Sequence, residues 1–200
     1  MRWDELFDDL ESQLEQGLTA EELDLEVEEE RLRLGRLTIR DRLATLLDGG
    51  GAPESSRVGL TLLGGMRMSV HPVTVGRDWF SADIADETHR TRQCIVPLAA
   101  VVGFSLTSEQ VTQSLRPAGR EADHPSLPAR LGLPFVLRDL CRRRRAVDLV
   151  LAPGELHGTI DRVGRDHLDL AVHERGVARR RSAVHEIRVV PLAGLVLVRL

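Results

Sequence analysis

The feature that most constrains the fold is a duplication in the later part of the chain. The stretch TVGRDWFSADI at 74–84 is echoed by RVGRDHLDLAV at 162–172, a shift of 88 positions. Further on, VPLA at 96–99 recurs at 190–193 with a shift of 94, so the second copy holds six more residues in a loop. Two copies of one supersecondary unit are therefore expected.

Each copy has the pattern of a helix followed by about five short strands. After the repeated Asp, apolar and polar residues alternate, which is the period of a half-buried strand. The preceding segments IRDRL at 39–43 and LRDLC at 137–141 also resemble each other. Short strands with tight turns bury one face most economically as a small bent barrel. Gly158 and the irregular phase between Ile160 and Val163 would supply the bend.

The repeated VGRD runs from one strand to the next, so it does not have the context of a phosphate loop, which needs a helix N-terminus. We expect Gly76 and Arg77, and likewise residues 164–165, to form the centre of a type II′ hairpin turn. Asp78 and Asp166 would then begin the next strand and hold the turn by local hydrogen bonds.

Before the duplicated part, the sequence predicts an acidic helical arm. Apolar residues recur at helical spacing from Trp3 to Leu14, and TAEE at 19–22 has the pattern of a capping box. The turn-rich stretch DGGGAPESSR at 48–57 marks a boundary. The predicted fold class is α+β, with an N-terminal helical arm followed by two tandem small five-stranded β-barrels. The expected domains are the arm at 1–47, the linker at 48–57, the first barrel at 58–106, a linker and helix at 107–145, and the second barrel at 146–200.

Charge divides along the same boundary. Residues 1–57 hold 7 Arg against 16 acidic residues, whereas residues 58–200 hold 20 Arg against 15. The acidic run from Glu21 to Glu30 is either a solvated helix face or an arm that covers a basic surface. All 27 basic residues are Arg, a bias typical of a high-GC genome, which weakens the argument from Arg richness to function.

Two stretches of the second copy carry a family resemblance. LVLAPGELHGTIDRVGRDHLDLAV at 149–172 resembles the first motif of Sm-like proteins, and VHEIRVVPLAGLVLVRL at 184–200 resembles the second. The first copy matches more weakly, at 60–84 and 93–106. The resemblance implies a small Sm-like or SH3-like barrel. The whole-chain pattern also resembles an uncharacterised family of high-GC bacteria, and that resemblance implies no activity.

The chain departs from the Sm pattern at the RNA pocket. Sm proteins hold a base with an Asn shortly after the Asp turn and with an Arg-Gly pair in the second motif. Here His167, Leu168 and Asp169 follow the turn, and Val189 follows Arg188. The resemblance therefore does not carry the RNA pocket over. Sm proteins also pair strands between protomers, so a tandem pair could pair internally or with a second chain.

The best candidates for a surface that contacts polyanions are two Arg clusters. They comprise Arg142, Arg143, Arg144 and Arg145, and then Arg179, Arg180 and Arg181. Such clusters neutralise phosphates if they lie on one side. Trp79, expected to face outward beside the first VGRD, is the one credible platform for stacking a base. The alternative is that these Arg residues complement a helix dipole and pair with the acidic arm.

Catalysis, metals and cofactors find no support in the sequence. It lacks HExxH, P-loop, GxSxG and GxGxxG motifs, and the grouped His157, His167 and His173 have no ligand spacing. Cys94 sits in an apolar strand pattern, while Cys141 would be reactive beside Arg if exposed. We predict no enzyme activity, no cofactor, no metal and no small-molecule substrate.

The N-terminus is not that of a signal peptide, and no apolar stretch approaches the length of a membrane span, so we expect a cytoplasmic protein without membrane contact. The functional prediction is a binding or adaptor protein that acts through protein partners or self-association. The alternative is an RNA- or DNA-binding regulator of Sm-like type.

Overall fold

The computed structural model describes residues 24–48, 57–85, 91–117 and 126–200. The chain divides into two compact units, residues 1–38 and 39–200. In the first unit, residues 24–36 are helical, and an ion pair of 2.6 Å joins Arg33 to Glu30 one turn earlier. The predicted features at 3–14 and 19–22, and all but the ends of the predicted linker, lie outside the described residues.

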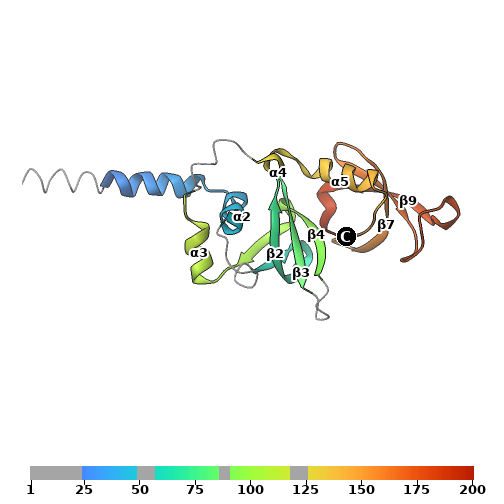
Figure 1. The fold of residues 1–200 in the computed structure, drawn as a ribbon, viewed down its shortest axis with the longest axis horizontal. Helices are drawn as coiled ribbons and strands as arrows, with labels where there is room; N and C mark the ends of the chain where they lie inside the picture. Colours follow the sequence, from blue (N-terminus) through green and yellow to red (C-terminus); the bar gives the residue numbers. More distant parts are fainter. Residues whose placement is uncertain (1–23, 49–56, 86–90, 118–125) are drawn as a thin grey trace, which may run out of the picture. The chain divides into compact units, whose positions relative to one another are not determined.

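Ten antiparallel strands of the second unit form one continuous sheet (Figure 1). Their order is β5-β1-β2-β3-β4-β10-β6-β7-β8-β9, so the order of the first five strands recurs in the last five. The strands are β1 (Val58–Leu62), β2 (Arg67–Val75), β3 (Trp79–Ala85), β4 (Thr91–Pro97), β5 (Val101–Ser105), β6 (Ala146–Leu151), β7 (Gly154–Val163), β8 (His167–Val172), β9 (Glu186–Pro191) and β10 (Leu195–Arg199).

The prediction of two closed five-stranded barrels is wrong. β4 of the first half pairs with β10 of the second, with Ile95 opposite Val198 and Cys94 opposite Arg199. No pairing between described strands closes either half, because β5 does not pair with β4 and β10 does not pair with β9. The physical reason is that β4 satisfies its outer backbone groups on the other half of the chain, so the ten strands join into one open sheet.

Local features of the strands do follow the repeat. Val70 lies opposite Ile84 in the first half, and Gly158 lies opposite Val172 in the second, 88 residues later. The ladder has an irregularity after Pro72, and again after Ile160, where the sequence predicted a bulge. A Cβ at Gly158 would lie 2.3 Å from the carbonyl oxygen of Ala171, so only glycine fits this close approach of two strands.

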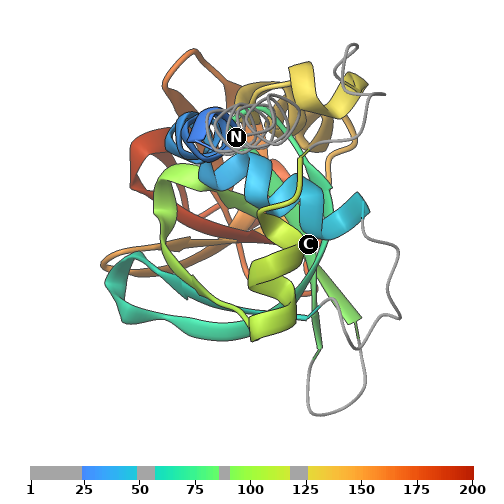
Figure 2. The ribbon, with the colours of Figure 1, turned by 90° about the vertical axis from the view of Figure 1, so that its left-hand side faces the viewer.

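Four α-helices accompany the sheet in the described part of the second unit. α2 and α3 pack against each other, α2 also contacts β2, and Figure 2 shows both helices in front of the strands. α5 packs against β7 and follows the short α4. The helices are α2 (Ile39–Asp48), α3 (Ser108–Ser114), α4 (Leu127–Arg130) and α5 (Leu133–Arg142).

Two apolar cores lie within this unit, and each contains residues of both halves. The first surrounds Phe80 and takes in Val150 and Val196 from the second half. The second surrounds Leu137 of α5 and takes in Ile95 and Trp79 from the first half. Burial of such side chains stabilises each by about 1.5–3 kcal/mol, so the two halves depend on each other for a large part of their stability.

Candidate functional site

The two VGRD turns have the same backbone hydrogen bonds. The Gly76 N–H donates to the Trp79 carbonyl at 2.8 Å, and the Gly164 N–H donates to the His167 carbonyl at 2.8 Å. The centre of each turn is therefore the Arg-Asp pair. Neither glycine has a positive φ, so the predicted type II′ turn with Gly at its first central position is wrong.

Close packing explains why each turn needs glycine. A Cβ at Gly76 would lie 2.2 Å from the Trp79 indole nitrogen, and a Cβ at Gly164 would lie 2.6 Å from the His167 ring. In both halves, the ring of the residue that follows VGRD, Trp79 or His167, folds back over the turn. The glycine is required by the space above it and not by its backbone conformation.

An arginine from a helix completes each turn. The carbonyl oxygen of Gly76 accepts from Arg40 Nε of α2 at 2.8 Å, and that of Gly164 accepts from Arg138 of α5 at 3.1 Å. These arginines occupy matching places in the related segments 39–43 and 137–141. The resemblance between those segments thus has a structural counterpart, since in both helices an arginine guanidinium donates to the glycine carbonyl of a VGRD turn.

The first turn is covered by the chain that leads into α5. The carbonyl of Leu131 accepts from the Arg77 N–H at 3.1 Å and from the Trp79 indole at 2.9 Å. The Leu133 N–H donates to the Asp78 carboxylate at 2.7 Å. Trp79 is only 6% exposed, so the prediction that it faces outward as a stacking platform is wrong. The segment before α5, distant in sequence, buries it.

The second turn has an open surface. Asp166 Oδ1 lies 2.8 Å from His167 Nδ1, and the side chains are 86% and 48% exposed. The hydrogen bond from His167 lowers the pKa of Asp166. Arg138 and the Leu192 N–H donate to backbone carbonyls of this turn. Among the described residues, no segment covers the second turn as residues 131–133 cover the first.

The first predicted Arg cluster closes α5 and leads into β6. Arg142 and Arg143 both contact Asp139, at 2.8 and 2.6 Å, and their hydrogen bonds, that of Arg143 foremost, lower the pKa of Asp139. Arg144 has a positive φ of 54° and lies 3.6 Å from Asp161. Arg145 is exposed.

The second predicted cluster meets the first at Asp161 of β7. Arg179 Nε and a terminal guanidinium nitrogen lie 2.8 and 2.5 Å from the two oxygens of Asp161, and these bonds raise the pKa of Arg179. Arg180 and Arg181 are exposed. Because Arg144 contacts the same carboxylate, the two clusters are adjacent. In the described part of the chain, Asp139 and Asp161 pair with four of their seven arginines.

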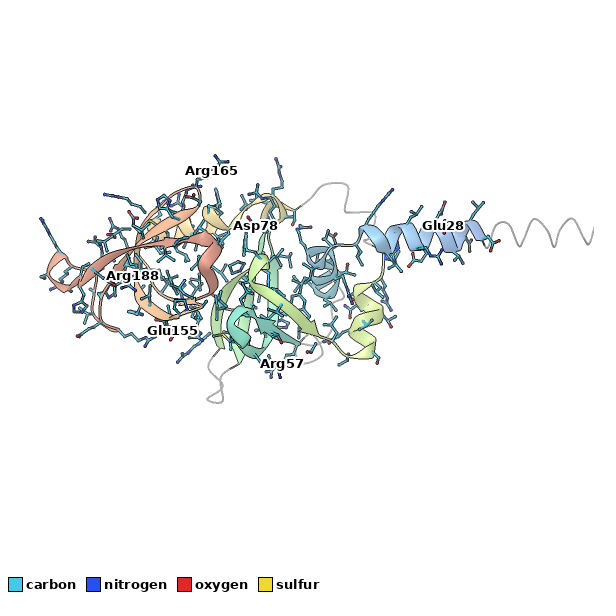
Figure 3. All side chains as sticks on the ribbon, turned by 180° about the vertical axis from the view of Figure 1, so that it is seen from behind. Glu28, Arg57, Asp78, Glu155, Arg165 and Arg188 are labelled. Atoms are coloured by element: carbon cyan, nitrogen blue, oxygen red, sulfur yellow. The ribbon has the colours of Figure 1, made fainter. Side chains whose placement is uncertain are left out.

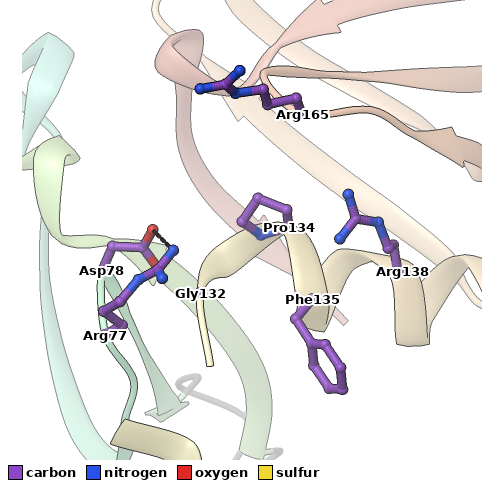
Figure 4. A pocket seen from close by; sticks show the side chains of 7 residues that line it. All are labelled: Arg77, Asp78, Gly132, Pro134, Phe135, Arg138 and Arg165. Atoms are coloured by element: carbon purple, nitrogen blue, oxygen red, sulfur yellow. Dashed lines mark ion pairs between the residues drawn. The ribbon is translucent and has the colours of Figure 1, made fainter. Parts of the chain in front are cut away.

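A groove that the sequence did not point to lies beside both VGRD turns (Figure 4). It has a volume of about 430 Å³ and brings together arginines from the two turns and from α5. Figure 3 places Asp78 and Arg165 toward one edge of the unit and Arg57 and Glu155 toward the other. The lining residues are Arg77, Asp78, Gly132, Pro134, Phe135, Arg138 and Arg165. The duplicated Arg of VGRD, together with the matching helix Arg, was the signal that could have found it.

Two histidines of the second half lie within hydrogen-bond distance of polar side chains. His157 Nδ1 lies 2.6 Å from Asp148 Oδ1, and His173, which is 3% exposed, lies 2.9 Å from the Thr159 hydroxyl. The alternation of apolar and polar residues after Asp166 would place His173 near the outer face, but the structure buries it. Among residues 24–48, 57–85, 91–117 and 126–200, no three His, Cys, Asp or Glu side chains come together as metal ligands.

The cysteines are both free thiols. Cys94 is fully buried, as the apolar strand pattern predicted, and burial raises its pKa to about 12. Cys141 is partly buried and its thiol donates to the Asp161 carbonyl at 3.3 Å.

No family model, no curated protein and no solved structure matches this chain. Within the part of the chain that the structure describes, none of the helices has both the length and the apolar character that crossing a bilayer requires.

Proposed function

We propose that this protein is a non-catalytic interaction module that associates through the two outer strands of its sheet, with a second copy of the chain as its partner. In the described sheet, β5 pairs only with β1, and β9 pairs only with β8. Unpaired strand edges offer rows of N–H and C=O groups that another strand satisfies by antiparallel pairing.

The observation that carries the proposal is a difference in burial between matching positions. At the internal junction, Ile95 of β4 is 3% exposed and Val196 of β10 is 2% exposed. Their counterparts at the outer edges, 94 residues away, are Val189 of β9 and Val102 of β5, and each is 62% exposed. The apolar residues that join the halves thus recur, uncovered, at the two ends of the sheet.

Matching positions also give the geometry of the contact. β9 corresponds to β4 and β5 corresponds to β10, so β9 of one copy would meet β5 of the next. By the register of the internal junction, Val189 would lie opposite Phe104 of the neighbouring copy. The contact is head-to-tail, and such contacts give closed rings or open filaments depending on the rotation between copies.

The test uses two variants that each block one edge. Val102→Lys leaves β9 intact, and Val189→Lys leaves β5 intact. Light scattering after size-exclusion chromatography should give an assembly for the unmodified chain, a monomer for each variant alone, and a dimer for their equimolar mixture. The matched control is Val73→Lys, an exposed valine on β2, which has a neighbouring strand on each side, and this variant should assemble normally.

Two results contradict the proposal. A monomeric unmodified chain at every concentration excludes self-association through the edges. Persistence of a dimer in Val102→Lys alone would point to β9 pairing with β9, which is a different, two-fold contact.

A cytoplasmic location belongs to the same proposal and is favoured by the two free cysteines.

A second candidate function is nucleic-acid binding by the two Arg clusters. The favouring observation is that Arg144 and Arg179 meet at Asp161, which gathers the clusters into one basic surface. Binding to phosphates releases counterions, so affinity should fall by orders of magnitude between about 50 and 200 mM salt. Fluorescence anisotropy with labelled single-stranded RNA and duplex DNA tests this. The double variant Arg145→Ala/Arg180→Ala should bind more weakly than the unmodified chain, and Arg67→Ala is the control. Absence of salt-sensitive binding at micromolar protein contradicts it.

A further inference from the structure

The groove beside the VGRD turns is the place where arginines from three separate elements converge. Arg77 comes from the β2–β3 turn, Arg165 from the β7–β8 turn, and Arg138 from α5. Figure 4 shows their side chains arranged around Pro134. The only carboxylate among the lining residues is that of Asp78, so the lining has a surplus of two positive charges.

These charges are poorly compensated by the chain itself. Asp78 uses one oxygen for the Leu133 N–H at 2.7 Å, and its other oxygen lies 3.8 Å from Arg77. Arg138 donates to the neutral carbonyl of Gly164. Arg165 is exposed and has no hydrogen-bond or ion-pair partner within the described residues. Like charges gathered at one hollow repel one another and favour a bound anion.

The donors available to that anion are guanidinium groups and not helix amides. The Leu133 N–H at the start of α5 is occupied by Asp78, Pro134 has no N–H, and the Phe135 N–H donates to the Gly132 carbonyl at 3.0 Å. Guanidinium forks match the oxygens of a phosphate group in geometry as well as in charge.

We propose that this groove binds the terminal phosphate of a small phosphomonoester through Arg77, Arg138 and Arg165. A phosphomonoester carries close to two negative charges at neutral pH, which balances the surplus of the lining, whereas a phosphodiester carries one. In Figure 4 the Phe135 ring points away from Arg165, so recognition rests on the phosphate and not on stacking. The site is independent of the sheet edges proposed for self-association.

Gly132 gives a way to disturb the site without changing its charge. A Cβ at this position would lie 2.5 Å from a guanidinium nitrogen of Arg77. Gly132→Ala should therefore push Arg77 out of the groove, and the fold should tolerate it because the displaced atom is the end of a flexible, exposed side chain.

The experiment is isothermal titration calorimetry of the full chain with inorganic phosphate, phenyl phosphate and dimethyl phosphate. We expect the two dianions to bind and the diester to bind at least about tenfold more weakly. Arg165→Ala should weaken phenyl phosphate about tenfold, the effect of losing one charge-assisted hydrogen bond, and Gly132→Ala should weaken it in the same direction. Arg67→Ala, an exposed arginine on β2, is the charge-matched control and should bind normally.

Three results overturn the inference: no binding of phenyl phosphate at millimolar concentration, equal affinity for the diester, or equal weakening by Arg165→Ala and Arg67→Ala. Equal affinity for the diester would point to the backbone of a nucleic acid instead. Because Arg165 is exposed, loss of folding does not confound its variant, and near-ultraviolet circular dichroism checks the fold of Gly132→Ala.

Discussion

The two VGRD turns share one sequence and one hydrogen-bond pattern, yet their surroundings differ. In the first, Trp79 is buried and bonded to Leu131, while in the second, His167 is half-exposed and bonded to Asp166. The difference arises from the segment before α5, which covers only the first turn. A duplicated motif therefore encodes the turn itself, and the rest of the chain decides whether that turn becomes core or surface.

The largest expected difference between the turns is the loss of stability on replacing the aromatic residue after VGRD. Trp79→Ala should lower the free energy of unfolding by about 3–5 kcal/mol, because it empties a buried site and removes the bond to Leu131. His167→Ala should change it by less than about 0.5 kcal/mol, because the ring is half-exposed. Urea unfolding followed by circular dichroism measures both. Similar losses in the two variants would show that the second turn is also part of the core.

The strands beyond the turns offer a second comparison. Gly158 holds the place that Val70 holds in the first half, and a Cβ there meets the Ala171 carbonyl oxygen at 2.3 Å. Gly158→Ala should destabilise the fold by about 3 kcal/mol through overpacking against backbone.

Gly103→Ala is the control in β5, where an added Cβ meets nothing within 4 Å, and it should change stability by less than about 0.5 kcal/mol. A neutral Gly158→Ala would mean that β7 and β8 separate without loss, and that the two halves are more alike than their glycines indicate.

The aspartates of the turns differ in a similar but smaller way. Asp78→Ala should lower the free energy of unfolding by about 1 kcal/mol, because it removes the acceptor of the Leu133 N–H at the start of α5. Asp166→Ala should have almost no effect, because its side chain is 86% exposed. Asp78→Asn keeps an acceptor oxygen and should recover most of the stability in the same unfolding assay. Failure of that rescue would assign the effect of Asp78 to charge instead.

The smallest expected effect is on the way the free energy of unfolding depends on acidic pH, to which the two halves contribute differently. Asp148 lies opposite His157, where the first half has the uncharged pair Gly59 and Ser69. Burial alone would raise the pKa of Asp148, but hydrogen bonds from His157 and Arg175 outweigh it and hold this pKa below its ordinary value.

A lowered carboxyl pKa stabilises the fold above its ordinary pKa of about 3.9, and that contribution is lost as the pH falls through the folded-state value. Asp148→Asn should therefore flatten the acid limb of a plot of unfolding free energy against pH. Arg175 also contacts Glu155. An unchanged acid limb would show that other carboxylates govern the acid response.

Much of the local structure was predictable from the sequence because it depends on neighbouring residues. The alternation after each VGRD predicted buried Phe80 and Leu168, and both are 0% exposed. The irregular phase after Ile160 predicted a break in the ladder that the strand register confirms. The helix predicted before the first copy, from the segment at 39–43, is α2.

The errors share one cause, which is contact between segments far apart in the chain. The alternation of residues predicted an outward-facing Trp79, because a local pattern contains no information about Leu131, which lies 52 residues later and whose carbonyl accepts from the indole. It suggested separate barrels because nothing local to β4 indicates that its partner is β10. The arginine groove was missed for the same reason, since its three arginines lie on three elements.

The sequence by itself determined where the repeated turns, the strands around them and the related helices lie, because side-chain alternation and helical spacing over a few residues suffice for these. Only the tertiary structure decided that β4 pairs with β10, that one turn is buried and the other open, and that arginines of both turns line one groove. Those outcomes depend on which distant segment satisfies each strand edge and covers each apolar ring, and that is a competition among contacts across the whole chain.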